Sequence, residues 1–82
     1  MTPAEHATEA AEQLALSTQA TEMHSRTRYA RLAQVHATLA HAAGTGDDYA
    51  TAEEMLASAK SAPWSGHLID QALAHATLAD RS

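Results

Sequence analysis

Apolar side chains recur three and four residues apart along most of the chain, a spacing that predicts amphipathic α-helices, each packed by one face. Three segments carry it: Tyr29, Leu32, His36, Leu39 and Ala43; Tyr49, Ala52, Leu56 and Ala59 with Met55 beside them; and Leu68, Ala72, His75 and Leu78 or Ala79, flanked by Ile69, Leu73 and Ala76. A fourth segment, nearer the N-terminus, is weaker: Ala7, Ala10, Ala11 and Leu14 share a face, and the phase then shifts through Leu16, Ala20 and Met23.

Turn and cap residues divide this pattern into helices. The stretch Thr2-Pro3-Ala4-Glu5 is a capping box, so a helix is expected to start at about Pro3. Gly44 suits the left-handed residue that follows a helix, and Thr45 or Asp47 can cap the next one. Pro63 is expected to end one helix and begin another, with 65–66 as a rival start, and Trp64 to pack there.

The pentapeptide HATLA occurs twice, at 36–40 and at 75–79. Residues 28–43 align with 67–82, and the AEQL of 11–14 aligns with the AEEM of 52–55. We therefore predict one all-α domain over residues 1–82, an antiparallel bundle of two tandem helix–turn–helix units at about 3–43 and 47–82.

The first unit leaves one alternative open. Residues 22–27, EMHSRT, are the expected place for its turn, but they contain no Gly or Pro. Ser25 could cap a new helix there. A continuous helix from Pro3 to Ala43, roughly 60 Å long and followed by a hairpin, fits the same residues.

Composition adds that the core is thin. The sequence has 21 alanines, eight leucines, one isoleucine, one valine and no phenylalanine or cysteine. Alanine favours helices but buries little area, and small domains with this deficit commonly rely on disulfides, metals or association. Because cysteine is absent, we expect self-association or docking onto a partner.

Charge and hydropathy exclude several classes of function. A net charge of −5 disfavours nucleic-acid binding, which depends on neutralising phosphates, and no apolar run approaches a membrane span. The N-terminal segment lacks the basic and apolar regions of a signal peptide, so a cytoplasmic protein is expected. Arg26, Arg28 and Arg31 form a small basic cluster with His24. It is interpreted as a solvated face, with docking of an acidic partner as the second interpretation and nucleic-acid binding as the third.

Six histidines raise the question of a metal site, but none lies three or four residues from another and no Glu-x-x-His occurs. We therefore predict no metal and no cofactor. His36 and His75 occupy equivalent positions of the repeat on apolar faces. They are interpreted as semi-buried histidines bonded to the facing helix, and a pH-sensitive interface is the alternative.

The AEQL of 11–14, followed by AQVHATLA at 33–40, resembles a group of small alanine-rich helical proteins of actinobacteria and their phages, with a looser second copy at 52–56 and 72–79. The resemblance implies the helical fold and an actinobacterial or phage source, and it implies no activity.

Neither a catalytic triad order nor a phosphate-binding loop is present, so we predict no enzyme. The expected function is a protein–protein interaction or assembly module, encoded by a phage or mobile element, that also forms homo-oligomers. The alternatives are a small DNA-associated regulator that uses the arginine cluster and a histidine-based metal or pH sensor. The predicted interaction face consists of Leu32, Val35, His36, Leu39, Leu68, Ile69, Leu73, His75 and Leu78.

Overall fold

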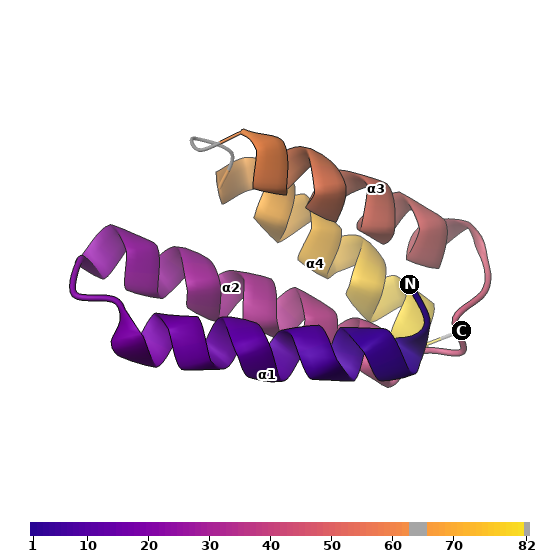
Figure 1. Cartoon of the computed structure of the whole chain (residues 1–82). Helices are drawn as coiled ribbons and strands as arrows, with labels where there is room; N and C mark the ends of the chain where they lie inside the picture. The colour runs from indigo at the N-terminus through magenta and orange to yellow at the C-terminus, as the bar shows by residue number, and fades with distance from the viewer. Residues whose placement is uncertain (63–65, 82) are drawn as a thin grey trace.

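In the computed structural model, residues 1–62 and 66–81 are described, and they fold as two antiparallel helical hairpins (Figure 1). The helices are α1 (Pro3–Gln19), α2 (Met23–Ala40), α3 (Asp47–Ser61) and α4 (Gly66–Arg81). Helix α1 packs on α2, α3 packs on α4, and the hairpins meet mainly through α2 and α4. The all-α class and the two helix–turn–helix units are therefore confirmed, and the continuous helix from Pro3 to Ala43 is wrong.

Helix α1 begins as predicted. The Thr2 hydroxyl accepts a hydrogen bond from the Glu5 N–H at 3.2 Å, and the Glu5 carboxylate accepts one from the Thr2 N–H at 2.8 Å. This reciprocal capping box satisfies two backbone donors that the first helical turn leaves unpaired.

The turn of the first hairpin lies earlier than the sequence suggests. Helix α1 ends at Gln19, and both Ala20 and Glu22 are extended, so three residues without Gly or Pro reverse the chain. Ser25 does not cap α2, since it lies inside the helix, and no side chain caps the N-terminus of α2. The Ser17 hydroxyl instead donates to the Arg26 carbonyl at 2.7 Å and ties the two arms together.

The connection between the hairpins uses glycine twice. Gly44 and Gly46 have φ of +85° and +101°, a region that L side chains rarely adopt. The left-handed conformation of Gly44 is thus confirmed, although α2 already ends at Ala40 with His41 as its C-cap. Gly46 is the N-cap of α3, so the predicted caps Thr45 and Asp47 are wrong. Asp47 instead lies in the first turn of α3, where its charge complements the helix dipole.

The second hairpin turn falls largely outside the described residues. Helix α3 ends at Ser61 as expected, and Gly66 is the first residue of α4 that the structure describes. The predictions for Pro63 and Trp64 lie outside the described residues.

Among residues 1–62 and 66–81, the core is built mainly by α2, α3 and α4, and half of its members are alanine. It consists of Leu32, Val35, Leu39, Ala42, Tyr49, Ala52, Leu56, Ala59, Ile69, Ala72, Ala76 and Ala79. All four positions predicted for the segment that forms α3 are buried, whereas on the preceding segment Ala43 is exposed and Tyr29 is half-buried.

The predicted face of α4 needs a correction. Ile69, Ala72, Ala76 and Ala79 are buried, while Leu78 is 51% exposed. Small alanines let α4 approach its neighbours closely, and Leu78 lies about 100° around the helix from Ala79, so it stays outside.

Helix α1 also presents a different face from the predicted one. His6 is its one buried residue, whereas Ala7, Ala11 and Leu14 point to solvent. Burying an alanine contributes little free energy, so a polar interaction made by His6 decides which face turns inward. Among the described residues, no helix is both long and apolar enough to cross a membrane.

Candidate functional site

Two histidines lie fully buried where the hairpins meet. The Nδ1 atoms of His6 on α1 and His36 on α2 are 2.8 Å apart, and both side chains are 0% exposed. Their rings are tilted with centroids 5.0 Å apart, and the Tyr49 ring stands edge-on to His6 at 5.6 Å. Burying polar groups is costly unless they are hydrogen-bonded, so the hydrogen bond between the two imidazoles offsets the cost of burying both rings.

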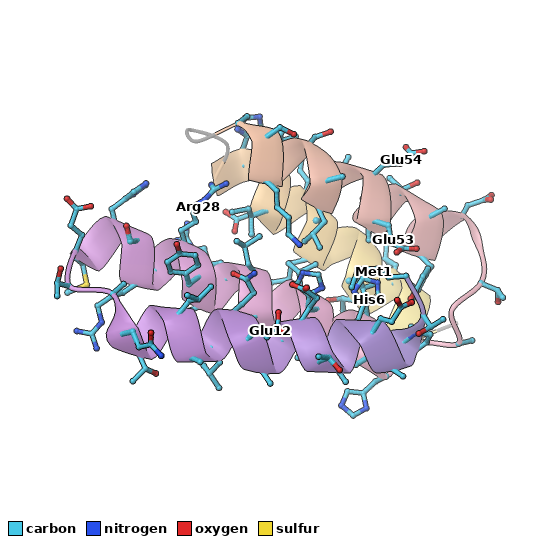
Figure 2. All side chains as sticks on the ribbon, in the orientation of Figure 1. Met1, His6, Glu12, Arg28, Glu53 and Glu54 are labelled. Atoms are coloured by element: carbon cyan, nitrogen blue, oxygen red, sulfur yellow. The ribbon has the colours of Figure 1, made fainter. Side chains whose placement is uncertain are left out.

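Helix α3 supplies a charged group at each end of the pair. The Glu53 carboxylate lies 3.2 Å from His6 Nε2, and the Lys60 ammonium lies 3.2 Å from His36 Nε2. Figure 2 shows His6, Glu53 and Met1 gathered at one end, where the Met1 ammonium is 2.8 Å from the same Glu53 oxygen. We call Lys60, His36, His6 and Glu53 the histidine relay.

Only one set of tautomers satisfies the whole relay when both imidazoles are neutral. Lys60 can only donate, so His36 Nε2 must accept and His36 Nδ1 must carry the proton. His6 Nδ1 then accepts a hydrogen bond from the Nδ1–H of His36, and His6 Nε2–H donates to the Glu53 carboxylate. The network thus assigns Nδ1–H to His36 and Nε2–H to His6, an assignment that follows from hydrogen-bond logic.

The surroundings favour these neutral forms. Burial, together with the nearby Lys60 charge, lowers the pKa of His36 to about 4. Burial also lowers the pKa of His6, although the Glu53 carboxylate opposes the shift. Burial of Tyr49 raises the pKa of its phenol, with the Glu53 charge acting in the same direction.

The helices bring these residues together by simple register. In an antiparallel hairpin, residues equally distant from the turn face each other, and the turn at 20–22 places His6 opposite His36. Glu53 and Lys60 are seven residues apart, two helical turns on the same face of α3 and about 10 Å along its axis. One helix therefore supplies both ends of the relay.

Sequence reasoning found one relay member and missed three. His36 was predicted to be a semi-buried histidine on a helix interface, and it is buried. His6, Glu53 and Lys60 were not predicted. The signal was available in the register, but a turn at 22–27 would place His36 opposite Gln13, so the misplaced turn concealed His6.

The repeat-equivalent His75 makes a simpler contact. Its Nδ1 lies 2.9 Å from an Asp48 carboxylate oxygen, and a third of its side chain is exposed. Each hairpin therefore joins a side chain from the beginning of its first helix to the histidine of its HATLA segment. Only the pair in the first hairpin is fully buried.

The predicted interaction face is distributed between the core and the surface. Leu32, Val35, Leu39 and Ile69 are buried in the chain's own core, where an outside partner could reach them only if the bundle opened. The half-buried positions are Leu68, Leu73 and His75.

The basic cluster is also divided. The Arg28 guanidinium donates to the carbonyl of Ala59 at the C-terminal end of α3, so it joins the hairpins. Arg26 and Arg31 are exposed.

Exposed apolar side chains gather at one end of the first hairpin. We call residues 14–27, including the turn, the free hairpin end, because Figure 1 shows this end of the first hairpin extending past the α3–α4 hairpin. Met23 is 75% exposed, and Leu14 and Leu16 are also exposed. A shallow hollow of about 510 Å³ lies between the arms and is lined by Leu16, Gln19, Ala20, Thr21, Glu22, Ser25 and Tyr29.

The described residues contain no group of three or more His, Asp or Glu side chains placed to hold a metal ion. Comparison with profiles of known protein families, with curated proteins and with solved structures finds no match to this chain. The resemblance to small alanine-rich helical proteins therefore stays a prediction.

Proposed function

We propose that this chain is a non-enzymatic protein-interaction module that contacts its partner through the free hairpin end. The supporting observation is where the scarce large apolar side chains lie. In a chain whose core is half alanine, Leu14, Leu16 and Met23 are exposed at this end instead of being buried. Exposed apolar residues beside a hollow are typical of surfaces that other proteins cover.

The partner would bury Leu16 and Met23 and fill the hollow beside Tyr29. Burial of apolar area contributes about 25 cal/mol per Å², so covering these side chains supplies a favourable term that the free chain lacks. A second copy of the chain is one candidate occupant, in line with the self-association expected from the thin core.

Site-specific photocrosslinking tests the proposal. A photoreactive phenylalanine derivative replaces Met23 in one protein and, as the control, Glu54 on the exposed side of α3 in another. In extract of the native host, the probe at position 23 is expected to give one discrete adduct that the probe at position 54 does not give. The double change Leu16→Lys and Met23→Lys should abolish competition by unlabelled protein while helicity is retained.

The size of the adduct identifies the occupant. Twice the mass of the chain indicates a second copy, and another mass indicates a different protein. The same adduct pattern from both positions, or a specific adduct from position 54 alone, would refute the free hairpin end as the contact surface.

A further inference from the structure

The histidine relay holds one positive charge at the His36 end, and that charge belongs to Lys60. Lys60 Nζ lies 3.2 Å from His36 Nε2. The lone pair of this nitrogen is the one to which an incoming proton would bind. An ammonium and an N–H cannot both donate to each other across this distance. Protonation of the pair therefore requires that Lys60 leave.

The added positive charge can move to His6, while the new His36 Nε2–H donates to solvent that takes the place of Lys60. A proton added to His36 Nε2 lets the Nδ1 proton of His36 pass to His6 Nδ1, across 2.8 Å. His6 then carries both N–H groups, one donating to His36 Nδ1 and the other to the Glu53 carboxylate. One proton enters, one moves between the rings, and no bond between heavy atoms changes.

The Lys60 ammonium has a second acceptor nearby, and a surface hollow lets solvent reach the relay. Its side chain is 40% exposed and already lies 3.9 Å from a Glu9 carboxylate oxygen. A second hollow, of about 220 Å³, is lined by Met1, His6, Glu53, Leu56, Ala57 and Lys60. This hollow reaches the relay from the surface at both of its charged ends.

We propose that the His6–His36 pair is a proton-binding switch in which an incoming proton displaces Lys60 from His36 to the Glu9 carboxylate of α1. Lys60 is the contact of α3 with His36, whereas Glu53 holds the other end to His6. Proton uptake strengthens the Glu53 contact by making it an ion pair and removes the Lys60 contact. The contact of Arg28 with Ala59 and the pairing of Lys60 with Glu9 keep α3 on the first hairpin, so the change is confined to the relay.

Charged groups from each neighbouring element set the pH at which the switch operates. Helix α1 contributes Glu5 and Glu9, and α3 contributes Tyr49, Glu53 and Lys60; the Met1 ammonium lies beside Glu53. Lys60 and the Met1 ammonium oppose proton uptake, whereas the carboxylates favour it. Burial of the two rings opposes it most strongly.

The first test uses the wild-type chain. Long-range ¹H–¹⁵N correlation spectra near pH 8 distinguish the two neutral tautomers of each imidazole. The proposal requires Nδ1–H at His36 and Nε2–H at His6. The opposite tautomer at either ring would overturn it, because Lys60 could not then donate to His36.

The second test changes the two ends of the relay with matched variants. Lys60→Gln removes the competing charge, so the pair should take up its proton at a pH higher by about half a unit to one unit. Glu53→Gln keeps an acceptor for His6 but removes the charge that favours protonation, so uptake should shift to lower pH. The exposed His41 and His67 supply reference signals in the same spectra. Identical midpoints in wild type and Lys60→Gln would overturn the proposal.

The displacement of Lys60 is measured on its own side chain. The ¹³Cε and ¹⁵Nζ chemical shifts of Lys60 should change at the pH where the imidazoles titrate, while far-UV circular dichroism still reports helices. Unchanged Lys60 shifts at that pH, or a change only together with loss of all helicity, would show a structural histidine pair and no switch.

Discussion

At the scale of single residues, the buried histidines link stability to pH. The pKa of His36 is lowered to about 4 in the folded chain, whereas an imidazole in the unfolded chain titrates near 6.5. Above about pH 7 both states are neutral there and the residue adds no pH dependence. As the pH falls from about 6.5 toward 4, the unfolded state binds a proton that the folded state does not, so stability is lost.

Denaturant unfolding at several pH values checks this expectation. Between pH 6.5 and 5 the free energy of unfolding should fall by about 1 kcal/mol per pH unit for each histidine kept neutral by folding. The variant His36→Gln should have a flatter profile, while the exposed control His67→Gln should keep the wild-type slope. Parallel profiles for wild type and His36→Gln would contradict the assignment of His36 as the acid-sensitive group.

At the scale of helices, the contact of Arg28 with Ala59 joins the two hairpins one residue before Lys60 of the relay. The guanidinium satisfies a carbonyl at the C-terminal end of α3, where positive charge is favourable. We expect Arg28→Ala to cost about 1–2 kcal/mol in urea denaturation, since a charged partner is removed from a partly buried acceptor. Arg26→Ala, two residues away and exposed, should cost less than about 0.5 kcal/mol. Equal costs for both variants would mean that the contact adds nothing.

The connection between the hairpins gives a second prediction at this scale. Gly44 has φ of +85°, and an added Cβ would lie 3.1 Å from Pro3 Cδ at the start of α1. Gly44→Ala should therefore destabilise the chain by about 1–2 kcal/mol through backbone strain and contact. Thermal unfolding measures this cost. As a comparison, Gly66→Ala should be neutral or stabilising, because Gly66 is helical and its added Cβ would meet only the Arg31 guanidinium at 3.9 Å. A neutral Gly44→Ala would contradict the positive φ.

The helices and their pairing could be predicted from the sequence because spacing, caps and the HATLA repeat are local signals. The capping box of Thr2 and Glu5 and the buried face of α3 were predicted residue by residue. The turn at 20–22 was misplaced because it lacks Gly and Pro, and that shift in register concealed His6. The buried face of α1 was missed for a different reason: alanine contributes so little on burial that a hydrogen-bonded histidine decides the orientation.

At the scale of the whole molecule, the two copies of the repeat are used unequally. Leu39 and Leu78 occupy the same place in their HATLA segments, yet Leu39 is fully buried and Leu78 is 51% exposed. The HATLA segment of α2 places Leu39 in the shared core. The HATLA segment of α4 instead places Ala76 and Ala79 in that core and leaves Leu78 exposed. Sequence identity between the copies therefore preserves the helix without preserving its environment.

This asymmetry gives a prediction about stability and association together. Leu39→Ala should cost about 2–5 kcal/mol, a large part of the stability of so small a domain, because it leaves a cavity in a core that is half alanine. Leu78→Ala should cost less than about 0.5 kcal/mol in the isolated chain. Urea denaturation measures both, with light scattering on a sizing column over a hundredfold range of concentration. If Leu78→Ala is as damaging as Leu39→Ala, Leu78 must be covered in solution, and the wild-type mass should then exceed 8.7 kDa and fall toward it in the variant. A small cost with an unchanged mass assigns Leu78 to the solvent-exposed surface.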